Sequence, residues 1–212
     1  KLSPYFNEMI LIFFNMFLRT MILNLVFIAS NRYANAYGSA SLAAYTIAYN
    51  IWIFTSFFID GYSNAGNALA GKFLGEKNNE KLRALGKKLL SINLQLAFIL
   101  IACYFMLYNH LGPFFNKDKN VILQFESIFW IVIIAQPFNS IAFTFDGIFK
   151  GLGRAKELRN TLAFGTFLVF FPLLFLLDQY QSGIYCIWVA LTGWMIYRGL
   201  SLLLRFRKIT NS

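Results

Sequence analysis

The stretch LAAYTIAYNIWIFTSFFIDGYSNAGNALAGKF, residues 42–73, decides the fold class of this 212-residue chain. It is longer than the roughly 20 mostly apolar residues that a helix needs to cross the hydrocarbon core of a membrane. At about 1.5 Å per residue, such a helix must tilt, protrude or break, and Gly61 or Gly66 is the expected bend. The same stretch carries amides and an acid, so it predicts both a membrane span and a candidate site.

Five further stretches are long and apolar enough to cross a membrane, which gives six predicted spans. The predicted spans are residues 9–30, 42–73, 89–107, 121–148, 162–177 and 184–204. The composition agrees, because 58% of the residues are hydrophobic and only 13% are charged, whereas soluble domains carry about a quarter charged residues. The sequence therefore predicts an all-α membrane protein, with residues 1–212 forming a single six-helix transmembrane bundle in a lipid bilayer.

The net charge of +10 is confined to short connections between the apolar runs. Positive loops stay on the cytoplasmic side of a membrane, so this distribution indicates an orientation and not a nucleic-acid partner. The predicted cytoplasmic side receives Lys72, Lys77, Lys81, Arg83, Lys87, Lys88, Lys150, Arg154, Lys156, Arg159, Arg198, Arg205, Arg207 and Lys208. The opposite side receives only Arg32, Lys117 and Lys119. We therefore expect a multi-pass protein of the cell (inner) membrane with both ends of this segment in the cytoplasm.

The residues of soluble catalytic sites are missing from the sequence. The single histidine, His110, is predicted in an outer loop, and no phosphate-binding loop or nucleophile elbow is present. Cys103 and Cys186 have no CxxC spacing and no histidine partner, so both are expected to be buried packing residues. We predict no enzyme activity, no metal and no cofactor, and expect coupling to a proton or sodium gradient.

A polar stripe follows the apolar half of residues 42–73. Asp60, Asn64, Asn67 and Gly71 recur at i, i+4, i+7 and i+11, which places them on one face of a helix. Polar groups at membrane depth need partners or a water-filled cavity. The stripe therefore predicts either one wall of an aqueous substrate pathway or a tight helix–helix seam made by small residues and amides.

Polar residues also occur within the first predicted span. Asn24 lies in this span, and Arg19 lies about half way along it, too deep to reach either interface easily. Arg19 therefore needs an acid, and Asp60 in the next span is the nearest in sequence that can supply one. The sequence predicts an Arg19–Asp60 clamp, with direct substrate contact by Arg19 as the alternative.

The fourth predicted span contains a proline and an acid. Pro137 removes a backbone hydrogen bond and should kink the helix. Asp146 precedes Lys150 by four residues, the favourable order for a local ion pair. Because Asp146 has this partner, replacing Asp60 by Asn is predicted to weaken transport more than the same change at Asp146. Gly147 and Gly151 form a GxxxG pattern, a weak signal for helix packing.

Three segments carry a resemblance to a known family. They are FLRT at 17–20, LAAYTIAYNIWIFTSFFIDGYSNAGNALAGKFLGEKN at 42–78 and QPFNSIAFTFDGIFKGLGRAKELRN at 136–160. The second resembles the eighth helix of multidrug and toxic compound extrusion (MATE) transporters, and its DG…A…ALAG…LG pattern is similar to the DinF-like branch. The resemblance runs nearly end to end, with the six helices in register.

This resemblance implies that the chain is the C-terminal six-helix lobe of a twelve-helix transporter, with an N-terminal lobe missing. It implies efflux of small cationic or amphipathic compounds through a cavity between or within lobes that rock between two states. Some branches place cation-binding acids in the first and fourth helices of this lobe. Here the first has only Glu8 at its entry and the fourth has Asn139 at the aligned position. The resemblance therefore favours proton antiport over sodium antiport, with the coupling aspartate on the missing lobe.

Two other functions stay open at this point. A flippase for lipid-linked sugars from the same superfamily would line its cavity with several cationic residues, and the sequence offers Arg19. A truncated, non-transporting membrane subunit would also fit a chain that begins without Met and looks like half of its relatives. The ordered family pattern and the polar stripe favour the transporter.

Overall fold

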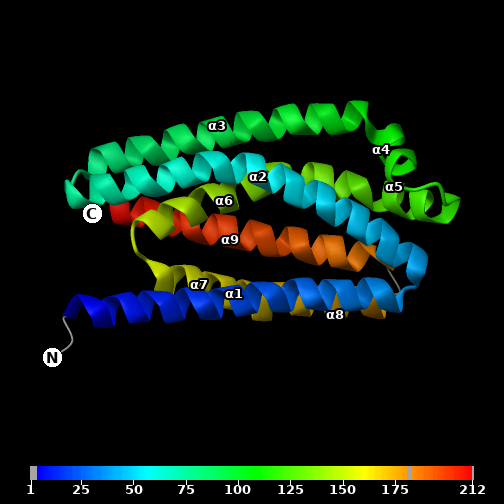
Figure 1. Cartoon of the computed structure of the whole chain (residues 1–212), viewed down its shortest axis with the longest axis horizontal. Coiled ribbons are helices and arrows are strands. Elements are labelled where there is room, and N and C mark those ends of the chain that lie inside the picture. The colour runs from blue at the N-terminus through cyan, green and yellow to red at the C-terminus, as the bar shows by residue number, and fades with distance from the viewer. Residues whose placement is uncertain (1–3, 181–182, 212) are drawn as a thin grey trace.

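The computed structural model describes residues 4–180 and 183–211, and in that part of the chain every regular element is a helix. Figure 1 shows long helices lying side by side along the long axis of the molecule. The elements are α1 (Pro4–Ala36), α2 (Ser39–Gly75), α3 (Asn79–Met106), α4 (Tyr108–Phe115), α5 (Lys119–Ile134), α6 (Gln136–Gly151), α7 (Ala155–Gly165), the π-helical turn η1 (Thr166–Phe170), α8 (Phe171–Gln179) and α9 (Tyr185–Asn211).

The described helices confirm the predicted all-α membrane fold. Five helical segments are long and apolar enough to cross a membrane, and the bent pair α5 and α6 gives the sixth if it counts as one span. The segment Ala155–Gln179 runs through α7, η1 and α8, so the fifth span is longer than the predicted 162–177. Each of the other spans also extends past at least one of its predicted ends, because polar residues continue a helix that apolar residues begin.

Helix α2 continues through both glycines at which a bend was expected. Gly61 and Gly66 keep their backbone N–H groups, so neither removes a hydrogen bond from the helix. The packing of α2 on α6 is also the most extensive between any two described elements. This packing holds the part of α2 that contains the two glycines in place. The length of α2 is therefore accommodated without a break.

The fourth span is kinked where the sequence predicts it. Helices α5 and α6 meet at Ala135 with a bend of 52°, and Pro137 lies in the first turn of α6. The Gln136 amide donates to the carbonyl of Val132 at 3.0 Å, across this break. The kink directs α6 between α2, α3 and α9, where its polar residues become buried.

The connection that follows α3 differs from the predicted outer loop. His110, Gly112 and Pro113 lie within the short helix α4, which packs against α5. Gly112 approaches Ile122 and Phe125 closely, and this packing stabilises a helix that Pro113 would otherwise disfavour. His110 therefore lies between the third and fourth spans as predicted, in a connection that is partly helical.

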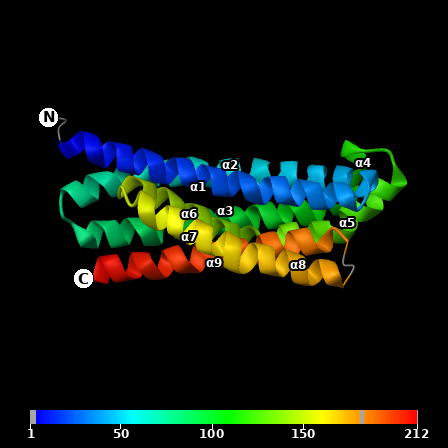
Figure 2. The ribbon, with the colours of Figure 1, turned by 90° about the horizontal axis from the view of Figure 1, so that it is seen from below.

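The two described chain ends lie at the same end of the bundle, together with the α2–α3 and α6–α7 connections (Figures 1 and 2). At the opposite end, Gly38 turns the chain between α1 and α2 with a φ of 105°, a conformation that favours glycine. Beside it, the Tyr37 hydroxyl donates to Asp178 of α8. Burial and this hydrogen bond raise the pKa of Tyr37, so its hydroxyl keeps the proton that it donates.

Buried apolar residues form two clusters, which lie on either side of the polar part of α6. One contains Trp188, Trp194 and Ala142, and the other contains Phe145 and Phe206. Large apolar side chains also coat the outside of the bundle, including Phe13, Phe57, Phe98, Phe167 and Leu204. Such a surface is suited to lipid and not to water. Cys186 is buried as predicted, whereas Cys103 lies on this outer surface because it follows the exposed face of α3.

Candidate functional site

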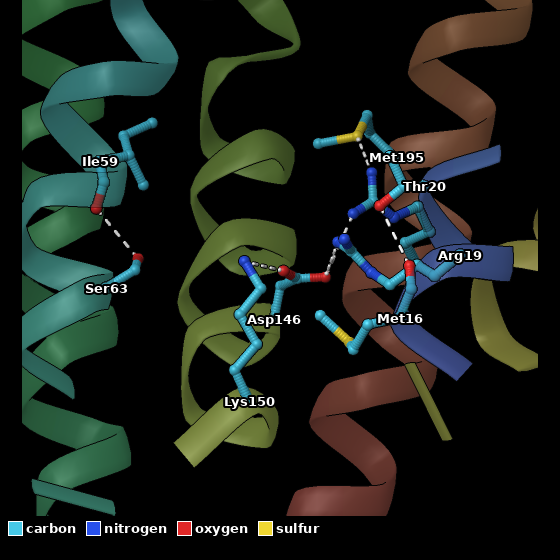
Figure 3. A network of polar contacts seen from close by, with 9 residues as sticks. Met16, Arg19, Thr20, Ile59, Ser63, Asp146, Lys150 and Met195 are labelled. Atoms are coloured by element: carbon cyan, nitrogen blue, oxygen red, sulfur yellow. Dashed lines mark hydrogen bonds and ion pairs between the residues drawn. The ribbon is translucent and has the colours of Figure 1, made fainter. Parts of the chain in front are cut away.

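The central feature of the bundle is a buried carboxylate surrounded by cations. Asp146 of α6 is 4% exposed. Its Oδ1 lies 2.6 Å from Nη2 of Arg19 in α1 and 3.4 Å from Nη2 of Arg198 in α9, and its Oδ2 lies 2.8 Å from Nζ of Lys150. Figure 3 shows the Asp146 side chain between Lys150 and Arg19. We call these four residues the charge cluster.

The charge cluster joins three helices through one acid. Lys150 reaches Asp146 from one turn further along α6, which confirms the predicted local pair. Arg19 also pairs with Asp146, so the predicted Arg19–Asp60 clamp was wrong. Helix α1 packs more extensively on α7 than on α2, and this position directs Arg19 toward α6. Proximity in sequence therefore gave the wrong partner.

Arg198 and Lys150 were both predicted on the cytoplasmic side, and Arg198 is the one that is fully buried. The structure buries it to 3% exposure within α9. Its guanidinium lies 4.6 Å from the Trp194 ring centroid, donates to Met195 Sδ at 3.2 Å and contacts Asp146. The burial of Arg198 could have been predicted from the sequence, because Arg198 lies well inside the long apolar run of the sixth span and not in its basic tail.

A cavity of about 200 Å³ adjoins the charge cluster between α1, α2, α6 and α9. Asp60 of α2 lines it together with all four residues of the cluster. Asp60 is partly buried and forms no ion pair within the described residues. The charged groups that line the cavity are therefore three cations and two acids, and only Asp60 is not already paired.

Aromatic rings line the apolar part of this cavity and separate it from a second pocket. Phe27 of α1 and Trp52 of α2 lie 6.0 Å apart between ring centroids, and Tyr49 lies 5.3 Å from Phe27. Beyond these rings, Asn24 and Arg32 line an open pocket of about 330 Å³ between α1 and α2, which Tyr49 and Phe27 share. The crevice between α1 and α2 thus has a charged half and an aromatic, amide-lined half.

Asn139 lies apart from the charge cluster. It is 1% exposed, and neither polar atom of its amide has a hydrogen-bond partner among the described residues. It borders a small cavity of about 10 Å³ with Trp52 and Trp188. This volume is at the lower limit of the space that one water molecule needs.

The predicted polar stripe of α2 does not form the buried seam. Asn64 is exposed, and Asn67 and Gly71 are only partly buried. The buried face of α2 is one residue away, at Ser63, Gly66 and Ala70. The backbone of the stripe does contribute to the seam, because a Cβ at Gly151 of α6 would lie 2.1 Å from the carbonyl oxygen of Asn67.

A second polar group, which no sequence pattern indicated, lies where α2, α3 and α6 meet. The Asn93 amide of α3 donates to Thr144 at 2.7 Å and to Ser63 at 3.4 Å, and Ser140 donates to the Asn93 carbonyl at 3.1 Å. All four side chains are buried. Gly147 allows the close approach, because a Cβ there would lie 2.6 Å from the Ser63 carbonyl oxygen. We call Ser63, Asn93, Ser140 and Thr144 the hydroxyl–amide seam.

The fold and the charged cavity define a class: a polytopic helical membrane protein with ionisable groups inside its bundle. Residues 16–176 match the family model MatE. The chain is 29% identical over 161 residues to Protein DETOXIFICATION 42 of Arabidopsis thaliana, covering 76% of this chain and 31% of that protein. It is 26% identical over 198 residues to DNA damage-inducible protein F of Escherichia coli K12, covering 90% and 41%.

The structural comparison agrees in fold with the family that this model match gives. The whole chain superimposes, with a TM-score of 0.88 and 16% identity, on 48% of a multidrug resistance MATE family transporter of the MOP superfamily in an outward-facing conformation. The chain therefore belongs to the MatE family and has the fold of one lobe of such a transporter. It spans less than half of the length of the curated relatives described above.

Proposed function

We propose that this chain is the C-terminal lobe of a DinF-like MATE transporter that exports cationic or amphipathic compounds by proton antiport. Its partner is a second six-helix lobe, and the protein lies in the cell (inner) membrane. The observation that carries the proposal is the cavity beside the charge cluster. Ionisable groups at membrane depth are rare and face pathways or bundle interiors. As a member of a transporter family, the chain is proposed to have no enzyme activity.

Within the cavity, Asp60 is the group best suited to a cationic substrate. Asp146 already has three cationic partners, whereas Asp60 has none in the described chain. Phe27 and Trp52 line the same cavity, and aromatic faces attract cations as well as apolar groups. A substrate with one positive charge and an apolar body would therefore place its charge at Asp60 and its body against the two rings.

The charge cluster supplies a possible means of coupling helix positions to substrate. It joins α1 to α6 and α9, while α1 and α2 have the cavity between them. A ligand in the cavity changes the electrostatic field at Arg19 and Lys150, which line it. We propose that substrate binding shifts α1 relative to α6, because a ligand moves an equilibrium only through contacts that differ between the two states.

The proposed coupling ion is the proton. The family resemblance implies that the neutral amide Asn139 stands where some branches carry a cation-binding acid, and an amide is a weaker ligand for a cation than a carboxylate. The proposed orientation has both described chain ends in the cytoplasm. Lysines and arginines gather at that end of the bundle, and positive loops stay inside.

The experiment is efflux from proteoliposomes that hold the full-length protein. A proton gradient is expected to drive efflux of a cationic dye, Asp60→Asn is expected to slow it, and a sodium gradient is expected to have no effect. The control is Asn64→Ala, which changes an exposed residue of the same helix without changing its charge. Absence of efflux for several cationic dyes under either gradient would overturn the proposal.

A second candidate has specific support from the structure. The cavity carries three cations, Arg19, Lys150 and Arg198, where the sequence offered Arg19 alone. Three cations can bind the pyrophosphate of a lipid-linked sugar better than the single arginine predicted from the sequence. In the same vesicles, a fluorescent lipid-linked sugar analogue would change leaflet if the protein is a flippase. Movement of neither the dye nor the lipid would favour the non-transporting subunit.

A further inference from the structure

A cavity at the basic end of the bundle lies away from the charge cluster. It has a volume of about 330 Å³ and lies between α3 and α9. Arg83 and Lys87 of α3 and Arg207 of α9 line it, and no acidic residue does. We call it the α3–α9 pocket. All three basic side chains are exposed, so a ligand from outside the bundle can reach them.

The cations of the α3–α9 pocket differ from other basic residues at this end of the bundle. Several of those are paired with acids: Lys72 and Lys81 with Glu76, and Arg154 and Arg205 with Glu157. Within the described ranges, Arg83, Lys87 and Arg207 form no ion pair, and Glu80 in the first turn of α3 forms none either. The pocket therefore keeps three positive charges that no ion pair neutralises.

The apolar wall of the pocket lies on its membrane side. Leu90 follows Lys87 along α3, and Leu203 precedes Arg207 along α9, so both lie further from the end of the bundle than the cations. Phe145 and Phe206 complete this wall. The cations thus lie nearer the end of the bundle, where a spanned membrane has its headgroups, and the apolar wall lies nearer the middle of the helices.

We propose that the α3–α9 pocket binds an anionic phospholipid, with its phosphate at the three cations and one acyl chain along the apolar wall. Basic pockets between transmembrane helices on the cytoplasmic side are suited to anionic headgroups. A zwitterionic lipid would bring a cationic group next to three others. A free phosphate would leave the apolar wall uncovered. The proposal does not depend on what the protein transports.

Native mass spectrometry of the full-length protein tests the proposal. The protein is equilibrated with phosphatidylglycerol or phosphatidylcholine, and retained lipid is counted. The wild type is expected to retain phosphatidylglycerol preferentially. The triple variant R83Q/K87Q/R207Q is expected to lose about tenfold or more of that retention, since each basic residue near an anionic surface contributes substantially. The matched control K77Q/K88Q/K208Q removes three exposed charges from the same end, none of which lines the pocket, and should retain lipid like the wild type.

Three results would overturn the proposal. One is equal loss by both triple variants, which would indicate general attraction to an anionic leaflet. Another is equal retention of phosphatidylglycerol and phosphatidylcholine by the wild type. The third is displacement by inorganic phosphate as effectively as by phosphatidylglycerol, which would indicate an anion site. If the triple variant fails to fold, R207Q alone, on the last turns of α9, is expected to lower retention by about fivefold.

Discussion

The charge cluster and the hydroxyl–amide seam are both buried and polar, but they differ in what surrounds them. The seam lies where glycines bring backbones into contact: a Cβ at Gly147 would lie 2.6 Å from a carbonyl of α2. The charge cluster lies beside a cavity of about 200 Å³ that a further acid, Asp60, lines. Buried polar groups therefore have two different surroundings in this protein: tightly packed helices at the seam, and a cavity at the charge cluster.

The largest effect is expected from removing the acid of the charge cluster. Asp146→Asn leaves Arg19 and Arg198 buried without a counter-charge, which costs about 3–5 kcal/mol for a broken buried pair. Thermal unfolding in detergent is the measurement. The control is Glu157→Gln, which breaks the more exposed pairs with Arg154 and Arg205 and should cost less than about 1 kcal/mol. Equal stability of the two variants would contradict a structural role for the cluster.

This expectation revises the order predicted from sequence. There, Asp60→Asn was to weaken transport more than Asp146→Asn, because Lys150 was the only partner foreseen for Asp146. The structure gives Asp146 two arginines as well. Asp146→Asn should therefore lower the amount of folded protein. The transport rates of the Asp146 and Asp60 variants must be compared per folded molecule.

The next effect concerns the seam. Gly147→Ala places a methyl group against the Ser63 carbonyl and should lower the stability by about 1–3 kcal/mol through overpacking. The control is Gly61→Ala, where nothing lies within 4 Å of the added carbon. That change should raise stability by up to about 1 kcal/mol, since Ala favours helices. Thermal unfolding of both variants measures the difference. A stability change in the same direction for both variants would contradict a tight seam at Gly147.

A smaller effect is expected at the amide of the seam. Asn93→Ala removes hydrogen bonds to Thr144 and Ser63 and should cost about 1 kcal/mol, typical of bonds between membrane helices. Transport per folded molecule should stay unchanged, because Asn93 is not among the residues that line the charged cavity. A slowed efflux rate at unchanged stability would instead assign the seam to the pathway.

The smallest effect on stability is expected at Asp60. Asp60→Asn breaks no ion pair in the described structure and should change the free energy of unfolding by less than about 0.5 kcal/mol, as substitutions that disturb no paired or tightly packed group do. Efflux of a cationic dye per folded molecule should nevertheless fall severalfold. Unfolding and efflux are measured on the same preparation. A stability loss like that of Asp146→Asn would show that Asp60 belongs to the structural cluster.

Features that depend on one helix were predictable from the sequence. The spans follow from runs of apolar residues, the kink from the missing N–H of Pro137, and the Asp146–Lys150 pair from a spacing of four residues. Each needs only the geometry of a single helix. Even the GxxxG of α6 packs closely on α2, as its small residues indicate.

Features that depend on packing between helices were not predictable in the same way. Arg19 has its partner on α6 and not on α2, because α1 packs mainly on α7. The buried face of α2 is at Ser63 and Gly66, one residue from the stripe that carries the most polar side chains. A helical pattern shows which residues share a face, but which neighbour covers that face depends on the arrangement of all the helices.

Thiol labelling tests the distinction between the two regions most directly. Ser56 lines the charged cavity and Ser63 lies in the seam, both on α2, and each hydroxyl bonds the carbonyl four residues earlier at 2.9 Å. Ser56→Cys and Ser63→Cys are made in full-length protein carrying Cys103→Ser and Cys186→Ser, and exposed to a charged, membrane-impermeant thiol reagent. The thiol introduced by Ser56→Cys is expected to react, and the thiol introduced by Ser63→Cys is not. Equal reactivity of the two variants, or reaction of Ser63→Cys alone, would contradict the distinction between cavity and seam.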